Sequence, residues 1–63
     1  MTNDEKIAAI AAMAVIEMKE KAIPSAMSYD VAERIFVELK KKGAKLPGGF
    51  TAALTVKIKA LLK

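Results

Sequence analysis

The stretch ELKKKGAKLPGGF, residues 38–50, separates two segments of apolar periodicity and decides how the chain folds. Gly43 stands where a C-terminal helix cap belongs, because glycine adopts the left-handed backbone conformation without strain. The Pro-Gly-Gly run at residues 47–49 is typical of a turn. The stretch therefore predicts that one helix ends at about residue 42 and another begins at about residue 51, with Leu46 tucked under the loop between them.

The segment before this loop has the periodicity of a helix, which we place at about residues 28–42. Its apolar residues recur at three- and four-residue spacing, while charged residues occupy other faces. The start of this helix has three candidate N-caps, Ser25, Ser28 and Asp30, and Asp30 has the capping spacing to Glu33. The expected buried positions are Val31, Ala32, Ile35, Phe36 and Leu39.

The segment after the loop is interpreted as a helix over about residues 51–62, with Thr51 as its cap. Its expected buried stripe is Phe50, Leu54, Ile58, Leu61 and Leu62. An alternative stays open, because TVKIKAL (residues 55–61) alternates as a strand does and RIFVEL (residues 34–39) can pair with it as a hairpin. Two strands alone seldom form a stable sheet, so the helix is favoured.

The first segment is predicted to form a helix over about residues 3–22. Thr2 and Glu5 have the spacing of a capping box, and Ile23 and Pro24 end the pattern. Its main apolar stripe is Ile7, Ile10, Ala11, Ala14, Val15 and Met18. The sequence therefore predicts an all-α fold, a small three-helix bundle formed by residues 1–63 as a single domain.

This first helix has more apolar surface than one stripe needs. Between Lys6 and Glu17 it carries no charge on any face. The helix is therefore expected either to be covered on more than one side or to associate with itself. The residues off the main stripe, which form a candidate interaction face, are Ala8, Ala9, Ala12, Met13 and Ile16.

Composition argues against catalysis and against structural metal. The chain has 63 residues and no Cys or His, so disulfides and the usual zinc ligands are missing. The commonest general base and the strongest common nucleophile are missing too. We expect a protein that is not an enzyme and binds no metal or cofactor.

The same composition bears on location. The longest uncharged run, residues 7–16, is much shorter than the roughly 20 residues that span a bilayer. The start, MTNDEK, is acidic on balance, whereas a secretory signal begins with basic residues. Because a chain without Cys suits a reducing compartment, the cytoplasm is the expected location and a membrane association is not favoured.

Charge is distributed unevenly along the chain. Residues 1–29 hold three Lys against four Asp or Glu, a net of −1, and residues 30–63 hold eight Lys or Arg against three Asp or Glu, a net of +5. This asymmetry indicates an anionic partner for the second half. A competing interpretation is that lysines near helix ends complement the helix dipole and keep an apolar chain soluble.

Residues 30–62 resemble the helix, extended loop, helix units of the SAP motif and its LEM-domain relatives. The resemblance rests on Ile35 and Leu39 in the first helix with Gly43 at its end, on KLPGG in the loop, and on Leu54 and Ile58 in the second helix. It implies binding to DNA or RNA, as in SAP-like units, or to chromatin partners, as in LEM-type units.

A mechanism for binding nucleic acid can be stated from the residues. Gly48 and Gly49 let the backbone approach a phosphate closely. The free backbone amides at the start of the next helix can then donate hydrogen bonds to that phosphate. Flanking lysines are expected to contact the phosphate backbone and to carry little base specificity. The candidate residues are Lys41, Lys42, Lys45, Gly48, Gly49, Thr51, Lys57 and Lys59.

Two other functions stay open. In the first, the chain is a structural or protein-interaction bundle, natural or designed, that binds a protein partner or a second copy. The binding face then consists of Ala8, Ala9, Ala12, Met13 and Ile16. Alternatively, the helix at residues 51–62 binds an anionic membrane surface through its mixed apolar and basic faces.

Overall fold

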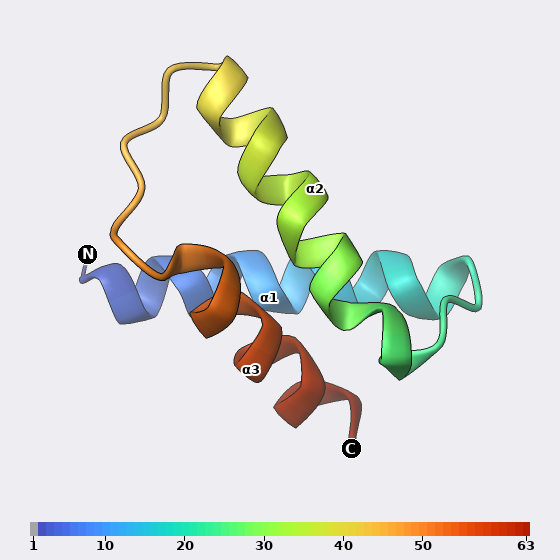
Figure 1. The fold of residues 1–63 in the computed structure, drawn as a ribbon. Coiled ribbons are helices and arrows are strands. Elements are labelled where there is room, and N and C mark those ends of the chain that lie inside the picture. The colour runs from blue at the N-terminus through green and yellow to red at the C-terminus, as the bar shows by residue number, and fades with distance from the viewer. Residues whose placement is uncertain (1) are drawn as a thin grey trace.

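The computed structural model describes residues 2–63, which fold into three α-helices and one short 3₁₀ turn. The helices are α1 (Asn3–Glu20), α2 (Ser28–Lys41) and α3 (Phe50–Leu62), with η1 (Ser25–Met27) between the first two. These residues form no strand, so the all-α prediction is confirmed and the hairpin alternative is wrong. Figure 1 shows α2 and α3 running in roughly opposite directions across the same side of α1.

Helix α1 begins at the predicted capping box. The Glu5 backbone N–H donates to Thr2 Oγ1 at 3.2 Å, and the Thr2 backbone N–H donates to a Glu5 carboxylate oxygen at 3.1 Å. These two bonds satisfy donors that a helix start otherwise leaves free. The predicted stripe of α1 is buried, except that Ile10 is half-buried.

Helix α1 ends two residues before the predicted position, in a left-handed turn. Ala22 has a φ of 55°, the Ala22 N–H donates to the Lys19 carbonyl, and the Ile23 N–H donates to the Met18 carbonyl at 2.8 Å. This is the pattern of a Schellman motif, in which glycine is the usual left-handed residue. The turn reverses the chain toward Pro24.

The predicted side-chain caps of α2 are wrong. Helix α2 begins at Ser28, its N-cap is Met27, and no side chain of the described residues caps it. Ser28 is fully buried, and its hydroxyl donates to the Ser25 carbonyl at 2.6 Å across the 3₁₀ turn. Because η1 leads directly into the helix, Ser28 lies inside it, and neither Ser25 nor Asp30 stands at the cap position.

The predicted glycine cap of α2 is present. Gly43 has a φ of 84°, and the Ala44 N–H donates to the Leu39 carbonyl at 3.0 Å. From there the chain runs in an extended loop to α3 (Figure 1). Leu46 of this loop is half-buried and packs against the core, as expected.

Helix α3 begins one residue earlier than predicted, at Phe50. Its N-cap is Gly49, with a φ of 74°, and no side chain among residues 2–63 caps it. The prediction that Thr51 is the cap is therefore wrong, because Thr51 already lies within the first turn. The Thr51 carbonyl instead accepts a 2.7 Å hydrogen bond from the hydroxyl of buried Thr55.

The core lies where α3 packs against both other helices. Leu54 and Ile58 of α3 are fully buried, and the Phe50 ring is buried as expected, 6.2 Å from that of Phe36. The prediction fails for Leu61, which is 48% exposed because the last turn of α3 extends past the core. The buried apolar set is Ile7, Ala11, Ala14, Val15, Met18, Val31, Ala32, Phe50, Leu54 and Ile58.

Candidate functional site

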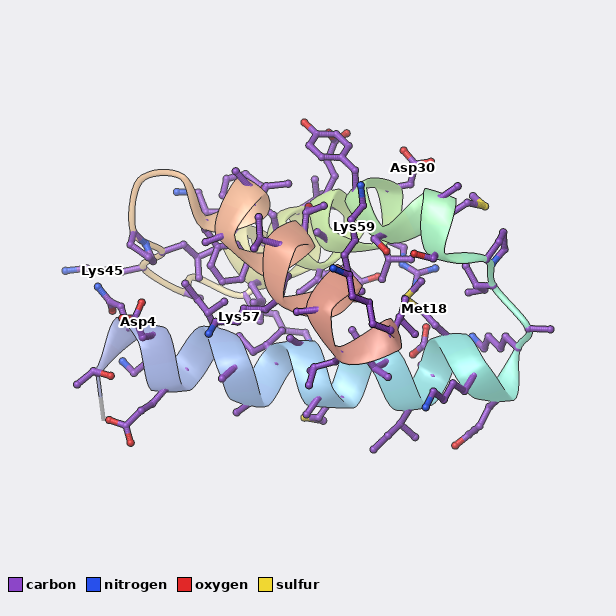
Figure 2. The ribbon with its side chains drawn as sticks, turned by 90° about the horizontal axis from the view of Figure 1, so that it is seen from below. Asp4, Met18, Asp30, Lys45, Lys57 and Lys59 are labelled. Carbon is purple, nitrogen blue, oxygen red and sulfur yellow. The ribbon has the colours of Figure 1, made fainter. Side chains whose placement is uncertain are left out.

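The candidate interaction face of α1 is solvent-exposed in the single chain. We call it the outer face, and all five of its members are exposed: Ala8, Ala9, Ala12, Met13 and Ile16. Met13 is 72% exposed and Ile16 is 58% exposed, which is high for large apolar side chains. Figure 2 shows α2 and α3 on one side of α1, and within residues 2–63 no other helix covers the opposite side.

The outer face follows from the pattern of α1 itself. The buried stripe that includes Ile7, Ala11 and Met18 occupies one side of the helix, and the outer-face residues occupy the side turned away from it. Since the segment between Lys6 and Glu17 has no charge, the second side is apolar as well. The single chain therefore leaves α1 covered on one side only.

An apolar groove runs along the seam between α1 and α2. One part has a volume of about 300 Å³ and is lined by Ile10, Met13, Ala14, Glu17, Ile35 and Leu39. A second part, of about 540 Å³, is mainly apolar but also includes two lysines; its lining is Lys6, Ala9, Ile10, Leu39, Ala44, Lys45 and Leu46. The two parts share Ile10 and Leu39, so we treat them as one groove. Ala9 and Met13 also belong to the outer face, and they join the groove to it.

The sequence did not reveal this groove. Periodicity assigns Ile10 and Leu39 to the core, yet both are half-buried and face the open seam. The groove exists because α3 packs against both α1 and α2, while α1 and α2 make little direct contact. Only the relative placement of the three helices shows this.

The far end of the seam holds an ion pair between helices. Arg34 of α2 donates to the Glu17 carboxylate of α1 at 2.8 Å, and Lys21 lies 3.6 Å from the same carboxylate. These side chains are about half exposed. An exposed pair of this kind contributes about 0–1 kcal/mol to stability, so it orients the two helices rather than holding them.

The structure does not gather the predicted nucleic-acid residues into one patch. Lys41 and Lys42 lie at the end of α2, and Figure 1 shows that end well separated from the start of α3, where Gly48 and Gly49 lie. The Phe50 N–H is already donated to the Pro47 carbonyl at 3.2 Å. Fewer free amides therefore face an anion than the sequence suggested.

The remaining candidates are spread along the molecule. Lys45 lies on the loop at the same end of the molecule as Asp4, whereas Lys59 lies farther along α3 (Figure 2). Lys57 and Lys59 are two residues apart on one helix, so they do not share a face. Thr51 is half-buried.

The end of α2 and the loop after it carry uncompensated positive charge. Within residues 2–63 both ion pairs involve Glu17, and neither includes Lys41, Lys42 or Lys45. Lys40 lies over the ring of Phe36, with its Nζ 5.9 Å from the ring centre. An anion that approaches this end therefore meets lysines whose charge is not already paired.

Tyr29 is an exposed aromatic residue on the first turn of α2. Its side chain is 52% exposed, so much of its ring lies in water. Hydrogen bonding to the Glu33 carboxylate, together with the charge of that carboxylate, raises the pKa of the Tyr29 hydroxyl. Tyr29 and Glu33 therefore make a surface contact on the outside of α2.

The described residues have no centre that suggests metal binding. Nowhere in residues 2–63 do three or more His, Cys, Asp or Glu side chains group so that they can hold a metal ion. None of the helices in this part of the chain has both the length and the apolar composition to cross a bilayer. No family model, curated protein or solved structure matches this chain.

Proposed function

We propose that this three-helix domain is a non-enzymatic protein-interaction module that binds through the outer face of α1. The observation that carries the proposal is the exposure of Met13 and Ile16, at 72% and 58%, on the side of α1 opposite the core. These side chains contribute little to the packing of the single chain, so their apolar character has no role in its core.

Physical chemistry favours covering this face. Fully burying one large aliphatic side chain is worth about 1.5–3 kcal/mol, and both large residues of the face remain mostly in water. The neighbouring alanine side chains are short, so a partner helix can approach α1 closely. The groove beside Ile10 and Leu39 extends the apolar surface toward α2. A helical partner segment suits such a surface.

Photo-crosslinking tests the proposal. A benzoylphenylalanine placed at Met13 is expected to form a defined adduct in cells that express the protein, with its partner identified by mass spectrometry. The same group placed at Ala53, which is exposed on α3, is the matched control and should give no such adduct. If position 13 gives no adduct, or only the pattern seen at position 53, the interaction function is wrong.

A second candidate function is binding of a nucleic-acid backbone. It is supported by Lys41, Lys42 and Lys45, which form no ion pair within residues 2–63, by the net charge of +5 over residues 30–63, and by the resemblance to SAP and LEM units. Because these lysines are spread over a helix end and a loop, they suit contacts to several phosphates rather than one cradle. Fluorescence titration with labelled DNA and RNA at two salt concentrations tests it.

A further inference from the structure

The outer face of α1 is complementary to itself in charge as well as apolar in character. Residues 5, 8, 12, 16 and 19 repeat at three- and four-residue spacing and therefore form one stripe on the exposed side of the helix. The stripe begins with Glu5, ends with Lys19, and has Ala12 at its midpoint. All five side chains are exposed.

The two ends of the helix also differ in total charge. Residues 4–6 hold two carboxylates and one lysine, a net of −1, whereas residues 19–21 hold two lysines and one carboxylate, a net of +1. Lys21, which is not on the stripe, lies beside Glu17. Lys19 is the cation of the stripe, and it has no ion pair within residues 2–63. Opposite charge at the two ends favours a partner helix that runs in the opposite direction.

We propose that the partner of the outer face is a second copy of this chain, with the two α1 helices packed antiparallel about a two-fold axis at Ala12. This inference rests on the proposed interaction function and names its partner. A two-fold interface uses the same surface on both copies, which a self-complementary stripe provides. In this register Glu5 of each copy faces Lys19 of the other, and Ala8 faces Ile16.

The capping role of Glu5 is compatible with this pairing. One of its carboxylate oxygens, Oε1, accepts the hydrogen bond from the Thr2 backbone. An ionised carboxylate accepts through both oxygens, so the second can accept from a lysine of the other copy. The cap and the intermolecular ion pair therefore use different atoms of the same side chain.

A parallel pairing is disfavoured by the same residues. It brings Glu5 against Glu5 and Lys19 against Lys19, and like charges placed opposite each other repel. The antiparallel register replaces both repulsions with two ion pairs related by symmetry. The short alanine side chains at positions 8 and 12 let the two helices approach closely, and Ile16 and Met13 then fill the space between them.

The association is tested first by light scattering and sedimentation over a range of chain concentrations. The wild-type chain should reach twice the single-chain mass. Ala12→Glu places two carboxylates together at the axis and should weaken the dimer by roughly tenfold or more while the helical spectrum is unchanged. Ala53→Glu, on the exposed side of α3, is the control and should dimerise as the wild type does.

The charge argument has its own matched pair of variants. Lys19→Glu sets a carboxylate against Glu5 of the other copy and should weaken dimerisation, most strongly at low salt. Lys21→Glu makes the same change in net charge two residues away, off the stripe, and should have a much smaller effect. Equal effects of the two variants would overturn the proposed register.

Engineered cysteines test the helix direction, since the chain has no cysteine of its own. In the antiparallel register the two copies of residue 8 are about eight residues, or about 12 Å, apart along the axis. This exceeds the roughly 7 Å that a disulfide tolerates between Cα atoms. Ala8→Cys alone should therefore not crosslink, whereas Ala12→Cys alone, and Ala8→Cys mixed with Ile16→Cys, should.

The outcomes separate this inference from the proposed function. A chain that stays monomeric at millimolar concentration, or efficient crosslinking of Ala8→Cys alone, overturns the antiparallel dimer. If the photo-crosslink at Met13 then joins a different protein, the interaction function stands with another partner. If it joins nothing, both are wrong.

Discussion

The ends of α1 and α2 allow a reciprocal test of how this small fold is stabilised. Both helices end in the same left-handed turn, but α1 has Ala22 there, with a φ of 55°, and α2 has Gly43, with a φ of 84°. We predict that Ala22→Gly stabilises the protein and that Gly43→Ala destabilises it. The two changes exchange the residue types at equivalent positions.

The magnitude follows from the backbone alone. A non-glycine residue in the left-handed conformation costs about 1–2 kcal/mol, and the extra freedom of glycine in the unfolded chain offsets about 0.5–1 kcal/mol of that. A Cβ added at Gly43 meets no atom within 4 Å, so no steric clash is added. Each change should therefore shift the free energy of unfolding by about 0.5–1 kcal/mol, with opposite signs.

This shift is large enough to measure in a domain of this size. At roughly 0.05–0.15 kcal/mol per residue, a chain this long has a total stability of about 3–9 kcal/mol. A change of about 1 kcal/mol moves the melting temperature of a small domain by about 4–8 °C. The two variants should therefore melt on either side of the wild type.

The assay is urea and thermal unfolding followed by far-ultraviolet circular dichroism. Low and equal chain concentrations are needed, because self-association adds to apparent stability. The double variant Ala22→Gly/Gly43→Ala should return close to the wild type, since the ends of α1 and α2 lie well apart in the structure (Figure 1). Ala53→Gly, in the exposed part of α3, is the control and should cost about 1 kcal/mol as glycine does in a helix. If Ala22→Gly is no more stable than the wild type, strain at the end of α1 is refuted.

Three further predictions concern other parts of the molecule. Ile58→Ala should cost about 2–5 kcal/mol and leave the domain barely folded, whereas Ile58→Val should cost about 0.5–1.5 kcal/mol, both measured by urea unfolding, because Ile58 is fully buried. Hydrogen bonds with Thr2 lower the pKa of the Glu5 carboxyl in the folded protein. The contribution of Glu5 to stability is therefore present above its unfolded pKa and disappears as the pH falls through the lower folded pKa. Glu5→Gln keeps the cap, so it should flatten this acid dependence in thermal melts between about pH 5 and pH 2. If the chain binds nucleic acid through its loop, a triple variant should bind more weakly; it carries Lys41→Glu, Lys42→Glu and Lys45→Glu. Its salt slope should fall by roughly 0.9 for each phosphate that it no longer binds, whereas unchanged affinity would rule out the loop.

The local features of this fold were predictable because they depend on residues near one another in the sequence. The capping box of Thr2 and Glu5, the glycine end of α2 at Gly43 and the buried stripe of α1 all follow from spacings of three or four residues. The starts of α2 and α3 were less predictable, because several residues near each of them can cap a helix. Ser28 is buried behind a 3₁₀ turn that has no sequence signal of its own, and Gly49 takes the place expected for Thr51.

The sequence by itself determined that the chain is helical, that α1 has two apolar sides, and that most of the positive charge lies in the second half. These properties depend on composition and short-range periodicity. Only the tertiary structure decided that α3 covers the predicted stripe of α1, that the second apolar side of α1 stays exposed in the single chain, and that a groove remains between α1 and α2. The physical reason is that periodicity marks a face as apolar, whereas the contacts among three helices decide how much of the apolar surface is covered and how much stays in water.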